Sequence, residues 1–187
     1  ITYSPYDEVA GLPPNEVAIL FLSRGPGGQL VDCPVPAGVA QETHVVGTGR
    51  GHAFNITTDQ PVAAYQMLPY GSGSAAATSA TLMLPSSVWD LNYVAINAYA
   101  KSGYVAEAEP LFVVVADEDN TKVTLDPKVA VNGGGGVAGG PPGVPIDYML
   151  NRGETIQFRQ VAELTGSPLI ADKRVGVFGG ATCLNIP

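Results

Sequence analysis

Residues 54–69 read FNITTDQPVAAYQMLP and predict a strand, a tight turn and a second strand. Phe54 and Ile56 alternate with polar residues, which is the pattern of a half-buried strand. The Asp-Gln-Pro segment after them is typical of a turn, because Asp hydrogen-bonds to nearby backbone and Pro restricts φ. Residues 62–67 contain good helix formers, so a helix is the alternative there. The short distance between Pro61 and Pro69 favours a strand.

A similar segment, SPLIADKRVGVFGG, returns near the C-terminus at residues 167–180. Asp59 aligns with Asp172 and Tyr65 with Phe178 at one constant offset. The second segment is therefore also expected to hold a strand, a turn at Asp172 and another strand.

Further upstream, residues 15–33 resemble residues 111–125, since each stretch is an apolar run, a turn and a short strand. The return of a whole unit suggests an internal repeat, at approximately residues 15–70 and 111–187. Chance similarity between short apolar runs is the alternative. We expect a single all-β domain over residues 1–187, sandwich-like, with two related β-modules packed as one unit.

The composition also favours short strands. Charged residues make up only 14% of the 187 residues, and 23 Gly and 16 Pro demand many turns. Turn signals every 8–12 residues are typical of a β-sandwich or barrel. Further strands are expected at residues 17–22, 29–33, 44–46, 80–84, 92–100, 111–116, 121–125, 148–150, 155–159, 169–171 and 175–179.

Four connections are expected between these strands. Residues 47–51 (GTGRG) predict a turn, and residues 86–90 a short helical turn with a Ser N-cap. Residues 117–120 (DEDN) predict the turn of a β-hairpin. The glycine-rich residues 132–143 predict a flexible excursion, with a boundary between domains as the alternative.

The charge balance argues against two classes of partner. The net charge is −8, and the nine Lys and Arg residues are scattered, so no basic stripe exists for nucleic acid or anionic lipid. No apolar run reaches the roughly 20 residues of a membrane-spanning helix, and no signal peptide is present. Because the chain begins at Ile1, we expect that an N-terminal segment has been removed or left out.

The two cysteines, Cys33 and Cys183, are too far apart for a CxxC redox or zinc motif. In an oxidising compartment they could form a disulfide that closes a long loop. Buried free thiols, or cysteine partners on segments outside this chain, are the alternatives.

Five stretches in order resemble the N-terminal domain of IgG Fc-binding protein, a domain with relatives in bacterial surface and secreted proteins. The stretches are FNITTDQPVAAYQMLPYGSG (54–73), ATLMLPSSVWDLNYVAINAY (80–99), FVVVADEDNTKVTL (112–125), NRGETIQF (151–158) and ELTGSPLIADKRVGVFGGATCLNIP (163–187). The resemblance implies an extracellular, β-rich, non-enzymatic module. It provides no binding residue, and immunoglobulin binding is not carried over from the animal protein.

The chain departs from this family pattern in two places. Family members usually continue beyond the NIP ending into another Cys-containing segment, which offers Cys183 a different partner. The glycine tract at residues 133–140 looks like an insertion.

No catalytic motif is evident. Residues 47–51 lack the GxGxxG fingerprint, and residues 71–75 do not match GxSxG. His44 and His52 could hold a metal with a carboxylate, but ordinary surface histidines are the favoured interpretation. No cofactor is expected.

Three weaker candidates remain. Asp117, Glu118 and Asp119 concentrate the oxygen ligands that calcium prefers, although a turn explains them as well. Asn55 begins the glycosylation sequon Asn-Ile-Thr and would face away from Phe54 and Ile56; in a bacterial protein it would be expected to stay bare. Four aromatic residues could stack on sugars, with ordinary packing as the alternative: Tyr70, Trp89, Tyr99 and Tyr104. Tyr70 and Tyr104 are taken as the candidate ligand surface.

The sequence therefore predicts an extracellular or cell-surface module for adhesion or binding, a non-catalytic part of a larger protein, whose partner is a protein or glycan surface or copies of itself. A subunit of an extracellular fibre or coat is the alternative, with residues 1–14 as an arm that donates a strand. A secreted hydrolase is the least favoured hypothesis.

Overall fold

The structure is a computed structural model that describes residues 11–22, 39, 43–68, 79–97 and 108–182. The chain divides into two compact units, one of residues 1–44 and 70–76, the other of residues 45–69 and 77–187. In the first unit, the expected buried strand at residues 17–22 is wrong. Val17 is 83% exposed, and residues 17–22 belong to no helix or strand, although the Val39 N–H donates to the Leu22 carbonyl at 3.0 Å. An apolar run forms a strand only where a partner completes its hydrogen bonds.

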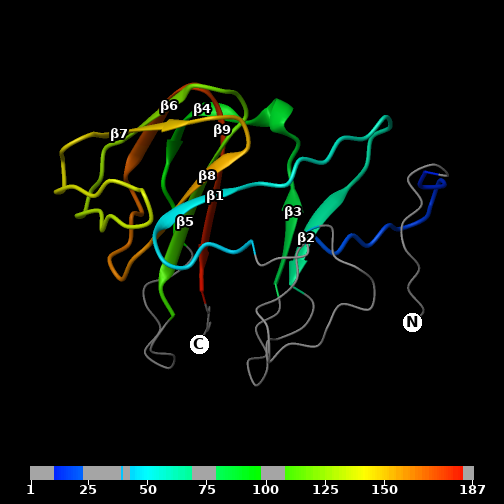
Figure 1. Ribbon diagram of the computed structural model, residues 1–187, viewed down its shortest axis with the longest axis horizontal. Helices are drawn as coiled ribbons and strands as arrows, with labels where there is room; N and C mark the ends of the chain where they lie inside the picture. Colours follow the sequence, from blue (N-terminus) through cyan, green and yellow to red (C-terminus); the bar gives the residue numbers. More distant parts are fainter. Residues whose placement is uncertain (1–10, 23–38, 40–42, 69–78, 98–107, 183–187) are drawn as a thin grey trace. The chain divides into compact units, whose positions relative to one another are not determined.

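The second unit is built from strands, which can be followed by their labels in Figure 1. The described strands are β1 (Gly49–His52), β2 (Ala64–Leu68), β3 (Ser79–Met83), β4 (Asp90–Val94), β5 (Pro110–Ala116), β6 (Thr121–Leu125), β7 (Ile146–Leu150), β8 (Glu154–Arg159) and β9 (Pro168–Ala181). One 3-10 turn, η1 (Ser86–Val88), is the only helical element among the described residues. The all-β prediction is confirmed.

Seven of these strands form one antiparallel sheet in the order β1-β8-β5-β9-β6-β7, with β4 also paired to β9. The other two, β2 and β3, form a separate antiparallel sheet. The sequence makes these strands for the expected reason: β5 is rich in valine, and β6 and β8 alternate between core and outer face.

Strand β9 is continuous over 14 residues, so the two strands with a turn at Asp172 expected there are wrong. β4 occupies one edge of β9, where Val94 pairs with Pro168 and Asp90 with Val175. β5 and β6 must therefore share the other edge, β5 beside the C-terminal half of β9 and β6 beside its N-terminal half.

This arrangement also corrects the hairpin predicted at residues 117–120. β5 and β6 run one after the other along β9 rather than pairing with each other. Seven positions separate Ala116 from Val123, whereas four separate their partners Val175 and Ala171, so the turn absorbs three extra residues. At the junction the Asp172 carboxylate accepts the N–H of Lys122 at 2.8 Å, which replaces a backbone hydrogen bond of the ladder.

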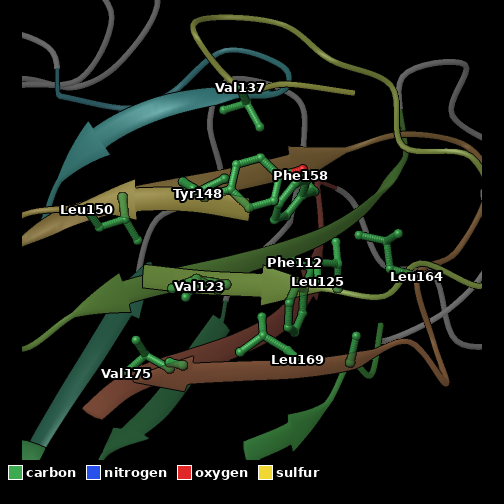
Figure 2. Close-up of a cluster of buried hydrophobic side chains, with 14 of the residues drawn as sticks. Phe112, Val123, Leu125, Val137, Tyr148, Leu150, Phe158, Leu164, Leu169 and Val175 are labelled. Atoms are coloured by element: carbon green, nitrogen blue, oxygen red, sulfur yellow. The ribbon is translucent and has the colours of Figure 1, made fainter. Parts of the chain in front are cut away.

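The sheet curls around a core of buried side chains (Figure 2). Phe158 of β8 packs on Phe112 of β5 at a ring separation of 6.3 Å, and edge-on against Tyr148 of β7 at 5.6 Å. Strands from the two ends of the sheet order thus meet across the core. Full burial of one such side chain stabilises the fold by about 1.5–3 kcal/mol.

The first and last strands of the sheet order are linked by one side chain. The guanidinium of Arg50 on β1 donates to the carbonyl of Met149 on β7 at 3.0 Å and to the carbonyl of Gly136 at 3.1 Å. The curl is therefore closed by hydrogen bonds from a side chain instead of a strand ladder.

The glycine-rich residues 132–143, expected to be a flexible excursion, form a mostly exposed loop that is held by two isolated bridges and one buried side chain. Val131 bridges Gly140, Gly134 bridges Val137, and the Val137 side chain is 95% buried in the core (Figure 2). A Cβ at Gly139 would lie 2.5 Å from the Val131 carbonyl oxygen. Glycine is needed here because two backbone segments approach closely.

The turn expected at residues 47–51 is instead mostly strand β1. A Cβ at Gly51 would lie 2.7 Å from a Val45 methyl, so this glycine makes room for a neighbouring side chain. The short strand expected at residues 44–46 is absent.

In residues 54–69, the second predicted strand is confirmed as β2, and the helix alternative is excluded. The first strand is wrong: residues 54–63 contain no helix or strand, and Phe54 and Ile56 are 40% and 57% exposed. Alternation predicts a strand only when one face can be buried, which does not occur here. The helical turn η1 is confirmed, but Pro85 occupies its N-cap without a side-chain hydrogen bond.

A substitution on β9 tests the packing of the single tryptophan. A Cβ at Gly176 would lie 2.6 Å from the Trp89 ring, whereas a Cβ at Gly180 would meet nothing within 4 Å. We expect Gly176→Ala to lower the free energy of unfolding by about 1–3 kcal/mol through overpacking. The control Gly180→Ala should change it by less than about 1 kcal/mol. Urea unfolding followed by Trp89 emission measures both, and equal midpoints would contradict the packing.

A second substitution tests the glycine loop. Val137→Ala removes buried methyl groups and is expected to cost about 1–3 kcal/mol. Val144 is 51% exposed in the same connection, so Val144→Ala should lie within about 0.5 kcal/mol of the unchanged protein. Chemical denaturation compares the two variants, and a loop outside the core would make them equally stable.

Candidate interaction surface

The two-stranded sheet carries an exposed apolar face, formed by Tyr65, Met67, Ala80 and Leu82. The register pairs Tyr65 with Leu82 and Met67 with Ala80, which places all four side chains on one side. Tyr65, Met67 and Leu82 are 58%, 62% and 52% exposed. The opposite face contains the polar pair Gln66 and Thr81.

Neither β2 nor β3 contains a charged residue, and no third strand joins them among the described residues. Within the described residues, each strand therefore has one edge without a strand partner. A two-stranded sheet is only marginally stable by itself in water, and natural proteins usually protect such edges with charges. This sheet has the features of a surface that receives another strand or a packed partner.

A smaller apolar patch lies on the outer side of β4 and β9. Asn92 pairs with Ile170, so Val94, Ile96 and Ile170 point outward together. They are 58%, 65% and 56% exposed. The patch adds to the apolar surface that the described residues present to solvent.

Of the residues predicted for the disulfide, the glycosylation site and the ligand surface, the structure describes Asn55 alone. Asn55 is exposed in the segment between β1 and β2. The proposed disulfide, Cys33 with Cys183, and the proposed ligand surface, Tyr70 and Tyr104, lie outside the described residues. The sequence argument missed the apolar face, because strand alternation shows which residues share a face and not whether that face is covered.

The residues of the acidic turn after β5, residues 117–119, form ion pairs and hydrogen bonds with other residues of the protein. Asp117 forms an ion pair with Arg174 at 3.4 Å, and the Asp119 carboxylate accepts the N–H of Arg152 at 3.0 Å. The Lys173 ammonium donates a hydrogen bond to the Asp119 carbonyl, and the Thr121 hydroxyl donates one to the Glu118 carbonyl. These contacts support the turn, and the described residues contain no group of three His, Cys, Asp or Glu that could hold a metal.

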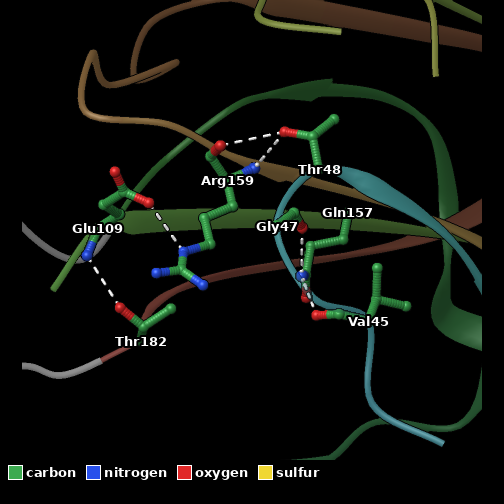
Figure 3. A network of polar contacts seen from close by, with 7 residues as sticks. All are labelled: Val45, Gly47, Thr48, Glu109, Gln157, Arg159 and Thr182. Atoms are coloured by element: carbon green, nitrogen blue, oxygen red, sulfur yellow. Dashed lines mark hydrogen bonds and ion pairs between the residues drawn. The ribbon is translucent and has the colours of Figure 1, made fainter. Parts of the chain in front are cut away.

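A half-buried ion pair joins Glu109, just before β5, to Arg159, the last residue of β8 (Figure 3). Arg159 donates to the Glu109 carboxylate at 2.8 Å, and the Glu109 N–H donates to the hydroxyl of Thr182. Nearby, the Gln157 amide donates to the carbonyls of Val45 and Gly47, both at 2.8 Å. The network fastens the chain before β1 to the sheet.

Buried polar side chains have the same structural use. Gln160 accepts the N–H of Asn132 and donates to two carbonyls, and Asn97 donates to the Leu111 carbonyl and accepts the N–H of Leu164. Within the described ranges, no buried side-chain nitrogen or oxygen lacks a hydrogen-bond partner.

Comparison with known protein families gives a match over the C-terminal part of the chain. The family model described as IgGFc binding protein matches residues 79–187, more than half of the chain. The chain belongs to this family. The resemblance recognised in the sequence is thereby confirmed. No curated protein and no solved structure matches the chain.

Membership of the IgGFc-binding family indicates a binding protein, typical of extracellular or secreted chains. The matched region begins at β3 and includes every described strand from β3 to β9. In the part of the chain that the structure describes, no helix has the length and apolar character needed to cross a bilayer.

Two titratable groups are perturbed in this unit. Burial raises the pKa of Tyr148 to about 12; its hydroxyl donates to the Ala138 carbonyl at 2.8 Å. The side-chain hydrogen bonds from Lys122 and then Thr124 lower the pKa of the exposed Asp147 carboxyl.

The Tyr148 shift predicts a loss of stability at high pH. Between pH 10 and 12 the unfolded chain releases this proton while the folded chain keeps it, so the free energy of unfolding falls as pH rises. Below pH 10 the group contributes no pH dependence. Denaturation midpoints measured across this window should show a smaller decline in Tyr148→Phe. Identical slopes in Tyr148→Phe and the unchanged protein would contradict the assignment.

Proposed function

We propose that this chain is an extracellular, non-catalytic binding module of a larger surface or secreted protein, and that its partner is another protein. The observation that carries the proposal is the apolar face of β2 and β3, which is uncharged and exposed and which no third strand of the described residues borders. Membership of a family described as a binding protein supports it.

The geometry favours recognition through strand addition. An extended partner segment would hydrogen-bond to a free edge of β2 or β3, and its alternate side chains would extend the apolar face. Main-chain hydrogen bonds would supply affinity, while Tyr65 and Met67 would provide large side chains for specific contacts. The closed sheet around β9 would serve as the scaffold of the module.

The same free edges favour one second candidate, a structural subunit that pairs with copies of itself in a fibre or coat. The absence of charges from β2 and β3 removes the usual barrier to edge-to-edge pairing. Ordered polymers in electron micrographs that grow with protein concentration would favour this candidate over a module that binds a different protein.

Adjacent residues on opposite faces of β2 provide the experiment. The chain, Met67→Lys and Gln66→Lys are each applied to an array of extracellular proteins that includes the immunoglobulin Fc fragment, and to a glycan array. We expect the chain to bind at least one protein, Met67→Lys to weaken that binding by about tenfold or more, and Gln66→Lys to retain it, because a charge costs most on an apolar contact.

Each other outcome has a clear meaning. Binding to glycans alone, or no retained protein, would contradict a protein partner. Equal binding by Met67→Lys would contradict the apolar face as the contact surface. Trp89 emission and the urea midpoint of each variant establish that the two lysine substitutions leave the fold intact.

A further inference from the structure

Asn55-Ile56-Thr57 is the single Asn-X-Ser/Thr sequon in the chain, and X is not proline. Neither the core nor the apolar face uses these residues. They lie in residues 54–63, between β1 and β2, where the segment can be followed in Figure 1.

The structure meets the requirements of a glycan acceptor. Asn55, Ile56 and Thr57 are all exposed, and the segment that carries them has no helix or strand. Neither the Asn55 amide nor the Thr57 hydroxyl is engaged in a hydrogen bond with another described residue. A bulky group on Asn55 would therefore extend into solvent without displacing a packed side chain.

We propose that Asn55 is an N-glycosylation site when the chain passes through a secretory pathway that contains an oligosaccharyltransferase. The donor is an oligosaccharide carried on a lipid diphosphate. The Asn55 amide nitrogen forms a bond to C1 of the first sugar, and the bond from C1 to the diphosphate oxygen breaks. The lipid diphosphate leaves with the electron pair, the amide loses one proton, and no oxidant or reductant is needed.

The glycan would have a physical consequence for its surroundings. Phe54 and Ile56 flank the acceptor and are 40% and 57% exposed, which leaves two apolar side chains in water beside it. A hydrated oligosaccharide at Asn55 shields such a segment and raises solubility. In the sequence, Asn55 lies nine positions before Ala64, the first residue of β2.

The test is expression of the full chain behind a cleavable secretion signal in cultured animal cells. Chains from the medium and from the cell extract are digested, treated with the amidase that converts glycosylated Asn to Asp, and mapped by mass spectrometry. We expect the larger part of the chains to show conversion at Asn55. We also expect Trp89 emission of the intact protein to be the same before and after removal of the glycan.

Matched variants separate the sequon from its surroundings. Asn55→Gln and Thr57→Ala should abolish the modification, Thr57→Ser should keep it, and Asn92→Gln, a change at an exposed Asn outside any sequon, should leave it unaltered. An unmodified Asn55 in chains recovered from the secretory pathway would overturn the proposal, as would a modification that persists in Asn55→Gln. Both results are independent of whether the apolar face binds a partner.

Discussion

The fold depends on one strand, β9, whose backbone hydrogen bonds reach three others. Its 14 residues pair with β4 along one edge, and with β5 and then β6 along the other. A strand of this length twists, so the two parts of the sheet that pair with its two halves turn toward each other. They enclose the core between β7 and β8. The Asp172 carboxylate maintains hydrogen bonding where β5 passes into β6, which keeps the strand continuous through its most polar residues.

The curl brings backbone segments so close that several positions have room only for glycine. Gly139 lies against the Val131 carbonyl, Gly135 against Gly49, and Gly176 beneath the Trp89 ring. Polar side chains also hold these segments together, because Gln157, Gln160 and Asn97 each donate a hydrogen bond to a backbone carbonyl of another segment. These groups hold the scaffold together, whereas Tyr65, Met67 and Leu82 on β2 and β3 are exposed to solvent.

The sequence predicted strands correctly where the residue pattern is regular. It failed where the formation of a strand depends on pairing or packing with a distant segment. β6 was predicted to the residue, and β5 and β8 within one, because each alternates or is uniformly apolar between clear turn signals. Residues 17–22 have an equally apolar pattern but are exposed and form no strand. The candidate site was missed for the same reason, since Tyr65 and Met67 look like core residues until their face is seen to be uncovered.

The sequence by itself determined the all-β class, the family, the positions of most strands after Ala64 and the absence of a recognisable catalytic motif, because these follow from local pattern and residue chemistry. Only the tertiary structure decided that residues 168–181 are one strand, that Val137 of the glycine-rich loop packs into the core, and that β5 and β6 share an edge of β9 instead of forming a hairpin. Each of these depends on contacts with residues far away in the sequence. A local pattern contains no information about which distant backbone group will lie opposite.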